Sequence, residues 1–426
     1  MFETLRNAWR IKEIRMKILY TLMIILVFRI GSYLPVPFID ISSLDGALAN
    51  SGAFFEYLNV LTGGAMNYGA LFAMSITPYI NASIIMQLLT VAIPPLERIA
   101  KEGEEGRKRI AKYTRFATVI LGLIQGAAYW YWLYASDYIL ASGKEHIFAA
   151  IVIILCFTAG TALMMWLGER IDQKGIGNGI SILLFAGIIS RLPSGIATLW
   201  TYFFDMKKYV AVIGILILFL VVIVFIVWMQ AAERRIPIQY AKRVVGRKQY
   251  GGQNTHMPIK VNMSGVMPII FASSILTIPS QILSFMGTTT DPSTIYKFLG
   301  VFSYQNLGYA LIYFVLIIAF AFFYTNIQYN PVEMANNLRK NSGAIPGIRP
   351  GKPTQEFIKK ILYRITLIGA IFLGVIAVLP IILGQFTEIN VSLGGTSLLI
   401  VVGVAIDTVQ QLESQMMMRH YKGFLD

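Results

Sequence analysis

Residues 53–91 read AFFEYLNVLTGGAMNYGALFAMSITPYINASIIMQLLTV, an apolar stretch that is broken in its middle. The part before Gly63-Gly64 is short and amphipathic, so it cannot cross about 30 Å of hydrocarbon by itself. The part after it is long enough, but Pro78 interrupts its hydrogen-bond ladder, and Asn81 and Gln87 carry amides for which lipid offers no partner. A discontinuous apolar element of this kind is typical of a pathway through a membrane.

The composition of the whole chain agrees with a membrane location. The chain is 56% hydrophobic and only 14% charged, with a mean hydropathy of +0.63, which excludes an ordinary soluble domain. Apolar runs of about 20 residues predict ten membrane-spanning helices. They lie near residues 18–34, 70–91, 114–136, 147–168, 179–200, 209–230, 262–286, 304–328, 364–386 and 394–412.

The net charge of +14 is explained mainly by topology. Most Lys and Arg residues fall in alternate connecting segments, and this asymmetry predicts that both termini are cytoplasmic. The first apolar run ends at Pro35-Val36-Pro37 without a small-residue cleavage site, so we interpret it as a retained helix rather than a signal peptide.

Chemically reactive side chains are scarce in the predicted spans. Few charged residues lie away from the ends of the spans, Arg29 and Asp407 among them, and Cys156 is the single cysteine. The three histidines fall in loops or the tail, without the spacing of a metal site. No catalytic set can be assembled at membrane depth, so we predict no enzyme, no metal and no cofactor.

Ten spans divide into two sets of five, which predicts an inverted repeat with halves at residues 1–200 and 201–426. Glycine-rich segments open the fifth and tenth spans, and prolines occur in the second and seventh. Broken helices and an inverted repeat also suit a secondary transporter of a small solute, which is the alternative function. Such transporters usually keep charged groups at membrane depth, and these are nearly absent here.

Three connections hold further motifs. The loops 231–260 and 329–364 are basic and rich in fixed turns, which favours a docking platform for an acidic or RNA-rich partner, with anionic lipid headgroups as the alternative. The glycine-rich turn 168–181 could in principle cradle a phosphate. That evidence is weak, because no strand precedes the turn and it lacks the GK[ST] ending.

Seven motifs in order resemble the SecY family, which forms the central subunit of the bacterial protein-conducting translocase. They are TPYINASIIMQLL (77–89), KEGEEGRKR (101–109), TALMMWLGERI (161–171), GIGNGIS (175–181), QNTHMPIKVN (253–262), GAIPGIRPGK (343–352) and GGTSLLIVV (394–402). The resemblance covers essentially the full length. It implies an all-α protein of ten transmembrane helices whose two inverted halves form a clamshell around an hourglass pore.

The resemblance also implies where the narrowest part of the pore lies. Its lining would be a ring of Ile76, Ile80, Ile180, Leu184, Ile270 and Ile400. Two pairs in this ring are spaced i, i+4 and so share a helix face. Leu184 departs from an all-isoleucine ring but conserves the volume. Without the family, these residues would be read as ordinary packing or lipid-facing side chains.

Two movable parts follow from the same resemblance. Residues 53–68 would form a plug beneath the ring, with Phe54, Phe55, Leu58, Gly63 and Gly64 assigned to it. From the residues alone, an ordinary extracellular loop with a surface helix is equally compatible. A lateral gate between the second and seventh spans would be lined by Asn81, Gln87, Ser273, Ser274, Thr277 and Ile278.

The resemblance finally implies the partners. SecE and SecG would be small membrane subunits, and Lys242, Arg243, Arg247 and Arg349 would engage the SecA ATPase or the ribosome, including ribosomal RNA. The cargo would be an unfolded preprotein with its signal peptide, and the location the bacterial plasma membrane. The energy source would lie outside this chain.

Overall fold

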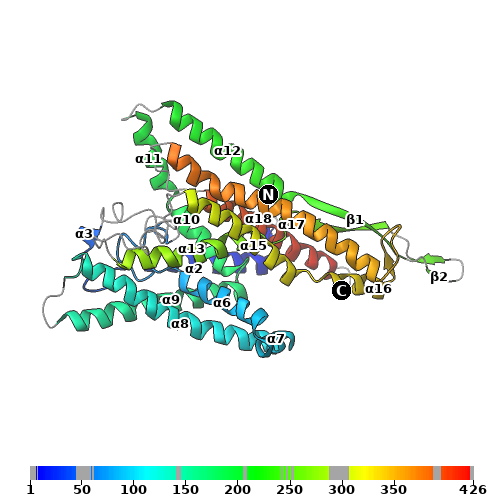
Figure 1. Cartoon of the computed structure of the whole chain (residues 1–426), viewed down its shortest axis with the longest axis horizontal. Helices are drawn as coiled ribbons and strands as arrows, with labels where there is room; N and C mark the ends of the chain where they lie inside the picture. Colours follow the sequence, from blue (N-terminus) through cyan, green and yellow to red (C-terminus); the bar gives the residue numbers. More distant parts are fainter. Residues whose placement is uncertain are drawn as a thin grey trace.

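The protein is a long bundle of apolar helices with small β-sheets at one end (Figure 1). The computed structural model describes residues 6, 8–44, 59, 62–140, 145–204, 209–240, 243–245, 248–250, 254–286, 307–386 and 395–422. The long helices in the described part are α2 (Lys12–Gly31), α6 (Thr77–Ala92), α8 (Glu104–Ala135), α9 (Glu145–Lys174), α10 (Gly179–Ser190) with α11 (Leu192–Phe204), α12 (Tyr209–Ala231), α13 (Met267–Met286), α15 (Leu307–Gln328), α17 (Lys352–Phe386) and α18 (Gly395–Lys422). With α10 and α11 counted together, each of the ten predicted spans has its helix.

Seven of these helical segments are long and apolar enough to cross a membrane. An eighth forms if α6 is joined to the short helix α7 (Pro94–Lys101), which is bent by 101° from it. The first predicted span, α2, carries several charged residues near its start, and the seventh, α13, contains Pro279. The fifth span is interrupted at Arg191, where α10 ends and α11 begins.

The second predicted span begins later than expected. Residues 71–76 form turns rather than helix, and α6 starts at Thr77 after Ser75, whose φ is +50°. Pro78 therefore lies in the first helical turn, where its missing N–H is harmless, and it starts the helix instead of breaking it. The discontinuity predicted within residues 70–91 is real, but the turns before Pro78 cause it.

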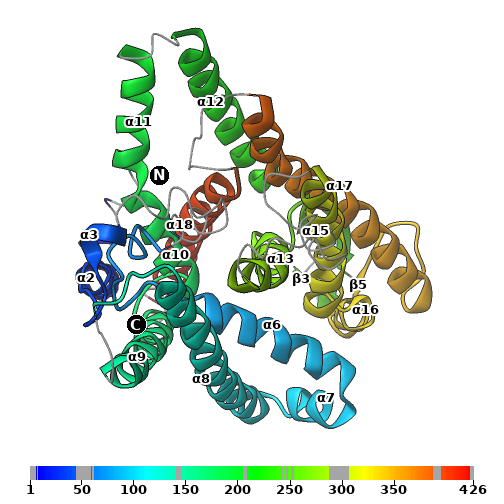
Figure 2. The ribbon, with the colours of Figure 1, turned by 60° about the vertical axis from the view of Figure 1, so that its left-hand side comes forward.

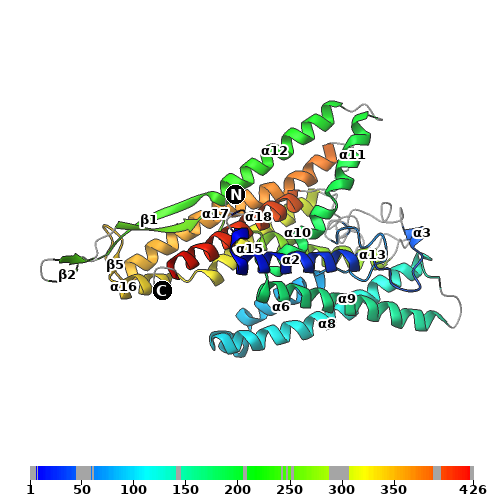
Figure 3. The same ribbon diagram turned by 180° about the vertical axis from the view of Figure 1, so that it is seen from behind.

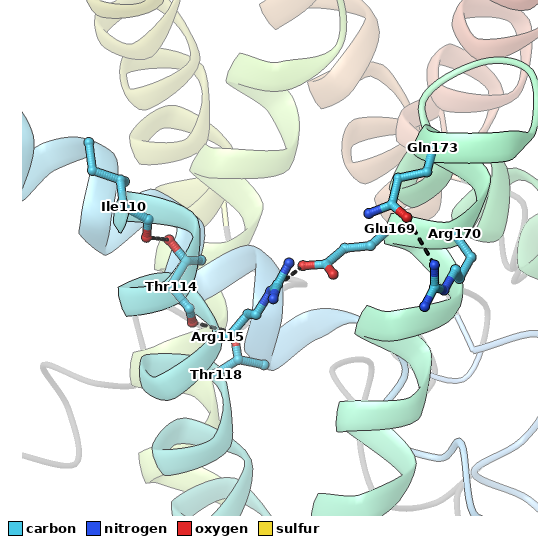
Figure 4. Close-up of polar contacts among 7 residues, drawn as sticks. All are labelled: Ile110, Thr114, Arg115, Thr118, Glu169, Arg170 and Gln173. Carbon is cyan, nitrogen blue, oxygen red and sulfur yellow. Dashed lines mark hydrogen bonds and ion pairs between the residues drawn. The ribbon is translucent and has the colours of Figure 1, made fainter. Parts of the chain in front are cut away.

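Small residues bring α8 and α9 and the turns near them into close contact. A methyl group on Gly160 of α9 would overlap the carbonyl oxygen of Leu71 in the turn before α6. At the far end of the same helix pair, the Arg115 guanidinium lies 2.7 Å from the Glu169 carboxylate (Figure 4). The guanidinium is half-exposed, so this ion pair adds little stability. It marks the ends of α8 and α9 that meet.

The two basic loops fold into one β-containing unit. Strand β1 (Glu233–Tyr240) pairs antiparallel with β4 (Asn254–Lys260) and, through Gln239 and Tyr240, with β5 (Gly343–Ala344). A second hairpin joins β2 (Arg243–Val245) and β3 (Lys248–Tyr250). Beneath the first sheet, Ile236 and Ile238 pack with side chains from α17 and from α16 (Pro331–Lys340). The all-α prediction holds for the spans, whereas this unit was predicted as loops.

The main core lies where α6, α10, α13 and α18 meet, and α2, α9, α12, α15 and α17 also contribute to it. Figure 2 shows α10, α13 and α18 near the centre, with α6, α8 and α9 on one side and α15 and α17 on the other. Figure 3 shows α2 lying along α9. The sheets, α7, α16 and the end of α18 all lie towards one end of the bundle, and α3 (Ile41–Leu44) lies towards the other.

Candidate channel constriction and gate

Six branched aliphatic side chains from four helices come together in the main core. Five of them are buried, and Ile180 is half-buried and packs against the same cluster. They are Ile76 and Ile80 at the start of α6, Ile180 and Leu184 on α10, Ile270 on α13 and Ile400 on α18. The sequence-predicted ring residues thus share one apolar cluster and do not face outward.

The turn before α6 holds two of these side chains on one face. Ile76 caps the helix, and its carbonyl oxygen accepts a hydrogen bond of 3.0 Å from the backbone N–H of Ile80. A methyl group built on Gly168 of α9 would lie 3.7 Å from Ile76 Cδ1 and 3.8 Å from Ile180 Cγ1. Gly168 of α9 therefore lies beside isoleucines from both α6 and α10, at ordinary van der Waals separation.

The glycine-rich turn before α10 is a packed structural element. Asp172 Oδ1 accepts a hydrogen bond from the Gly179 N–H at 2.7 Å, and the Asn178 side chain accepts one from the Ser181 N–H. Thr21 Oγ1 of α2 accepts from the Ile176 N–H at 3.1 Å. Side chains of the protein already use these three N–H groups, so they are not free to bind a phosphate. The turn instead fixes the position of α10.

The predicted gate residues lie on α6 and α13, which are neighbours in the bundle. Asn81, Ser273 and Ser274 are buried, Gln87 is half-buried and Ile278 is 43% exposed. The backbone of Thr277 is helical, and its side chain lies outside the described part. Gln87 donates to Ser83 Oγ at 3.4 Å, and Ser273 donates to the Ile270 carbonyl at 3.0 Å. Both bonds stay within one helix, so neither ties α6 to α13.

Two of the predicted plug residues fall in the described part of the chain. Gly63 and Gly64 have φ values of +68° and +92°, which glycine adopts readily, and both are buried. Phe54, Phe55 and Leu58 lie outside the described residues. The Gly63 carbonyl accepts a hydrogen bond of 3.1 Å from Arg29 Nη1 of α2, and Ser190 Oγ lies 3.4 Å from it.

The sequence alone assigns no role to Arg29, although it is one of the few charged groups within the predicted spans, as is Asp407. That rarity was the signal that could have identified it. The second group, Asp407, is exposed on α18. Among the described residues, no group of three or more His, Cys, Asp or Glu side chains could hold a metal ion.

The predicted docking residues sit at the end of the bundle that carries the sheets. Arg349 is exposed in the turn between β5 and α17, and its carbonyl oxygen accepts a hydrogen bond of 2.9 Å from Thr354 Oγ1. Arg243 belongs to β2, but its side chain is outside the described part, as are Lys242 and Arg247 altogether. Lys260 of β4 donates to Gln410 Oε1 of α18 at 2.6 Å, which attaches the sheet to the bundle.

This fold and site define a polytopic helical membrane protein with an aliphatic cluster at the meeting point of four helices. A sequence model of the SecY family matches residues 70–409. Protein translocase subunit SecY of Halalkalibacterium halodurans is 44% identical over 444 residues, covering all of both chains. The same subunit of Thermotoga maritima is 43% identical, covering all of this chain and 98% of its own. This chain therefore belongs to the SecY family.

Solved structures show the same fold. The structure of a protein-conducting channel matches with a TM-score of 0.66 and 19% identity, covering 94% of this chain and 92% of its own. Sec61 in a canine ribosome–channel complex from the endoplasmic reticulum matches with a TM-score of 0.62, 18% identity and the same coverage. The ten long helices thus adopt the clamshell of protein-conducting channels. The solute-transporter alternative finds no support in these comparisons.

Proposed function

We propose that this protein translocase subunit passes unfolded secretory polypeptides through the centre of its helix bundle and releases transmembrane segments sideways into lipid. The observation that carries the proposal is that six branched aliphatic side chains, contributed by α6 and the turn before it, α10, α13 and α18, share the main hydrophobic core. A polar or charged lining would suit a solute or ion pathway. An apolar lining suits a passage that must close without holding its cargo.

A ring of branched aliphatic side chains has two useful properties. At rest it excludes water and therefore blocks ions. During transport it closes around an extended chain of any sequence, because it offers no fixed hydrogen-bond partner. We assign this ring to Ile76, Ile80, Ile180, Leu184, Ile270 and Ile400, and the burial of all of them except the half-buried Ile180 supports the assignment. Leucine at position 184, where the other ring positions hold isoleucine, conserves the side-chain volume, so the ring still seals.

The lateral gate is the contact between α6 and α13. Buried Asn81, Ser273 and Ser274 make this neighbourhood more polar than the rest of the main core, which favours easy separation. An apolar signal helix that enters such a seam gains about 0.8 kcal/mol for each CH₂ group that it transfers to an apolar environment. The helix therefore partitions into lipid, while polar segments continue across the membrane.

The energy for transport comes from outside the chain, because the proposed pathway is passive. The exposed Arg349 turn and the basic β-unit form the docking surface for the SecA motor or the ribosome. The similar Sec61 channel was solved in a complex with the ribosome, which supports this choice of partner. SecE and SecG complete the membrane complex. Anionic lipids neutralise the basic residues that are nearest to the bilayer.

We place the protein in the bacterial plasma membrane, with both termini in the cytoplasm and halves at residues 1–200 and 201–426. The charge asymmetry of the connections supports this orientation. The β-unit, α7 and α16 lie towards the end of the bundle where α18 ends, as a common cytoplasmic side requires (Figure 1). The chain is a channel subunit and not an enzyme.

A stalled secretory polypeptide tests the proposal directly. A photocrosslinker placed at Ile270 should capture the stalled chain during motor-driven translocation in vesicles. The matched control is Val210 of α12, which is 87% exposed on a helix without charged residues and should capture lipid only. Equal capture at both positions, or none at Ile270, would contradict the proposed path.

A further inference from the structure

Arg29 is a charged side chain in the last turn of α2, in a chain whose spans hold very few charges. It is half-buried, and in the described part of the chain no carboxylate lies within ion-pairing distance of it. Its guanidinium is satisfied by neutral groups instead. Nη1 donates to the Gly63 carbonyl at 3.1 Å, Nη2 donates to the Tyr33 hydroxyl at 2.9 Å, and the group lies 4.9 Å from the centre of the Tyr33 ring.

The Gly63 carbonyl is the shared acceptor of a small network. The Ser190 hydroxyl, at the end of α10, also approaches it at 3.4 Å while donating more closely to the Gly187 carbonyl at 2.6 Å. The turn that contains Gly63 is thus attached on one side to α2 and on the other to α10. The Tyr33 and Tyr68 rings, 5.1 Å apart, add a second contact between α2 and this turn.

The fit around Gly63 leaves no space for a side chain. A methyl group there would lie 2.6 Å from Ser190 Oγ, 3.0 Å from Arg29 Nη1 and 3.1 Å from the Gly187 carbonyl oxygen. The positive φ of Gly63 adds strain for any other residue. The network therefore requires both the arginine and the glycine, although they are 34 positions apart in sequence.

We infer that Arg29 is a positioning residue that holds the turn 62–69 against α2 and α10 and so keeps the channel closed at rest. The inference rests on the proposed function and on the family resemblance, which assigns residues 53–68, and so most of this turn, to a plug beneath the ring. A hydrogen bond from a charged donor to a neutral carbonyl is strong. It can nevertheless break during opening, because the departing carbonyl carries no charge that would be left unpaired. An ion pair at the same place would be harder to separate and restore.

The turn provides its own reporter of opening. Met66 is 1% exposed and packs with Tyr129, Leu133 and Phe157 in a cluster separate from the main core. A cysteine at this position reacts slowly with a water-soluble thiol reagent while the turn is seated, and quickly when the turn leaves. Replacing the native Cys156 by serine removes the single competing thiol.

The experiment uses the Met66→Cys, Cys156→Ser chain, assembled with its partner subunits in vesicles and planar bilayers. Arg29→Met removes the donors while retaining an unbranched side chain, and it should raise both labelling and resting conductance about tenfold. Arg29→Lys retains the positive charge but lacks the paired guanidinium donors, so its labelling and conductance should lie between those of the parent and those of Arg29→Met. Arg170→Met is the matched control, because Arg170 also lies over an aromatic ring, with 5.1 Å between its guanidinium and the centre of the Trp166 ring. Arg170 belongs to α9 and makes no contact with the Gly63 carbonyl network described above.

Gly63→Ala provides an independent test, because it leaves Arg29 intact and separates the partners by steric overlap. It should shift labelling and conductance in the same direction as Arg29→Met. If both variants stay within about twofold of the parent, the inference is wrong. Ile80→Asn in the same bilayers separates the role of Arg29 from the proposed channel. If Ile80→Asn leaks ions and Arg29→Met does not, the role of Arg29 is refuted and the proposed channel is unaffected. Failed photocapture at Ile270 would instead refute the channel itself.

Discussion

Gly168 on α9 and Gly179 at the start of α10 meet backbone to backbone, because a methyl group on Gly179 would overlap the carbonyl oxygen of Gly168. This contact sets the distance between α9 and the helix that carries Ile180 and Leu184. The Asp172 carboxylate reinforces it by accepting the Gly179 N–H. The position of α10 therefore depends on the absence of a side chain at Gly179.

Gly179→Ala should destabilise the protein by about 1–3 kcal/mol, the usual cost of overpacking a close contact. Thermal unfolding of the purified complex measures it. Gly214→Ala on α12 is the matched control, because a methyl group there meets nothing within 4 Å. The control should melt at the parent temperature or slightly above, since alanine favours a helix by up to about 1 kcal/mol. Equal melting of the two variants would show that the backbone contact does not limit packing.

Asparagine at two ring positions should make the closed channel leak ions. Ile80→Asn and Ile270→Asn each place an amide in the aliphatic cluster, where it attracts water and ends the dewetted barrier. The resting conductance in planar bilayers should rise for each variant and further for the double variant. Ile80→Leu conserves volume and apolar character, so its conductance should stay at the parent value. Unchanged conductance in the double variant would refute the ring.

Periodicity and hydropathy predicted the helices of this chain well, because long apolar runs have few other solutions in a membrane. They failed where tertiary contacts decide the local structure. The turns at residues 71–76 are as apolar as a helix, but Gly160 lets the Leu71 carbonyl approach α9 and the chain bends there. The break at Arg191 was missed although the sequence marks it, because Pro193 and Gly195 follow Arg191 within the predicted span.

The β-unit was also missed, although a signal was present. In the segment ERRIPIQY, Ile236 and Ile238 are separated by Pro237 and flanked by Arg235 and Gln239, and they become the buried face of β1. The pairing of β1 with β5 joins segments about a hundred residues apart, and no local pattern predicts that. The site residues came from family resemblance. Isoleucine in an apolar helix carries no signal that separates a pore from ordinary packing.

Asn81→Leu should strengthen the closed contact between α6 and α13. Asn81 is a polar side chain that is buried at this contact. Leucine removes the cost of burying that amide, about 1–3 kcal/mol. The melting temperature should rise, and a model transmembrane segment should insert more slowly. Gln87→Leu is the control, because Gln87 is only half-buried and already bonds to Ser83. Faster insertion in Asn81→Leu would argue against a gate at this contact.

Arg349→Glu should reduce motor-driven translocation about tenfold, which corresponds to ~1.4 kcal/mol of lost coupling, without changing the fold. The shape of the turn comes from the positive φ values of Gly347 and Gly351 and from the bond between Thr354 Oγ1 and the Arg349 carbonyl. The exposed Arg349 side chain is therefore free to face a partner.

Lys359→Glu on α17 makes the same charge change at another exposed position and is the control. Motor-dependent transport of a preprotein into vesicles provides the measurement, with melting temperature as the check on folding. If both variants lose transport equally, the effect is one of net charge and Arg349 has no specific docking role.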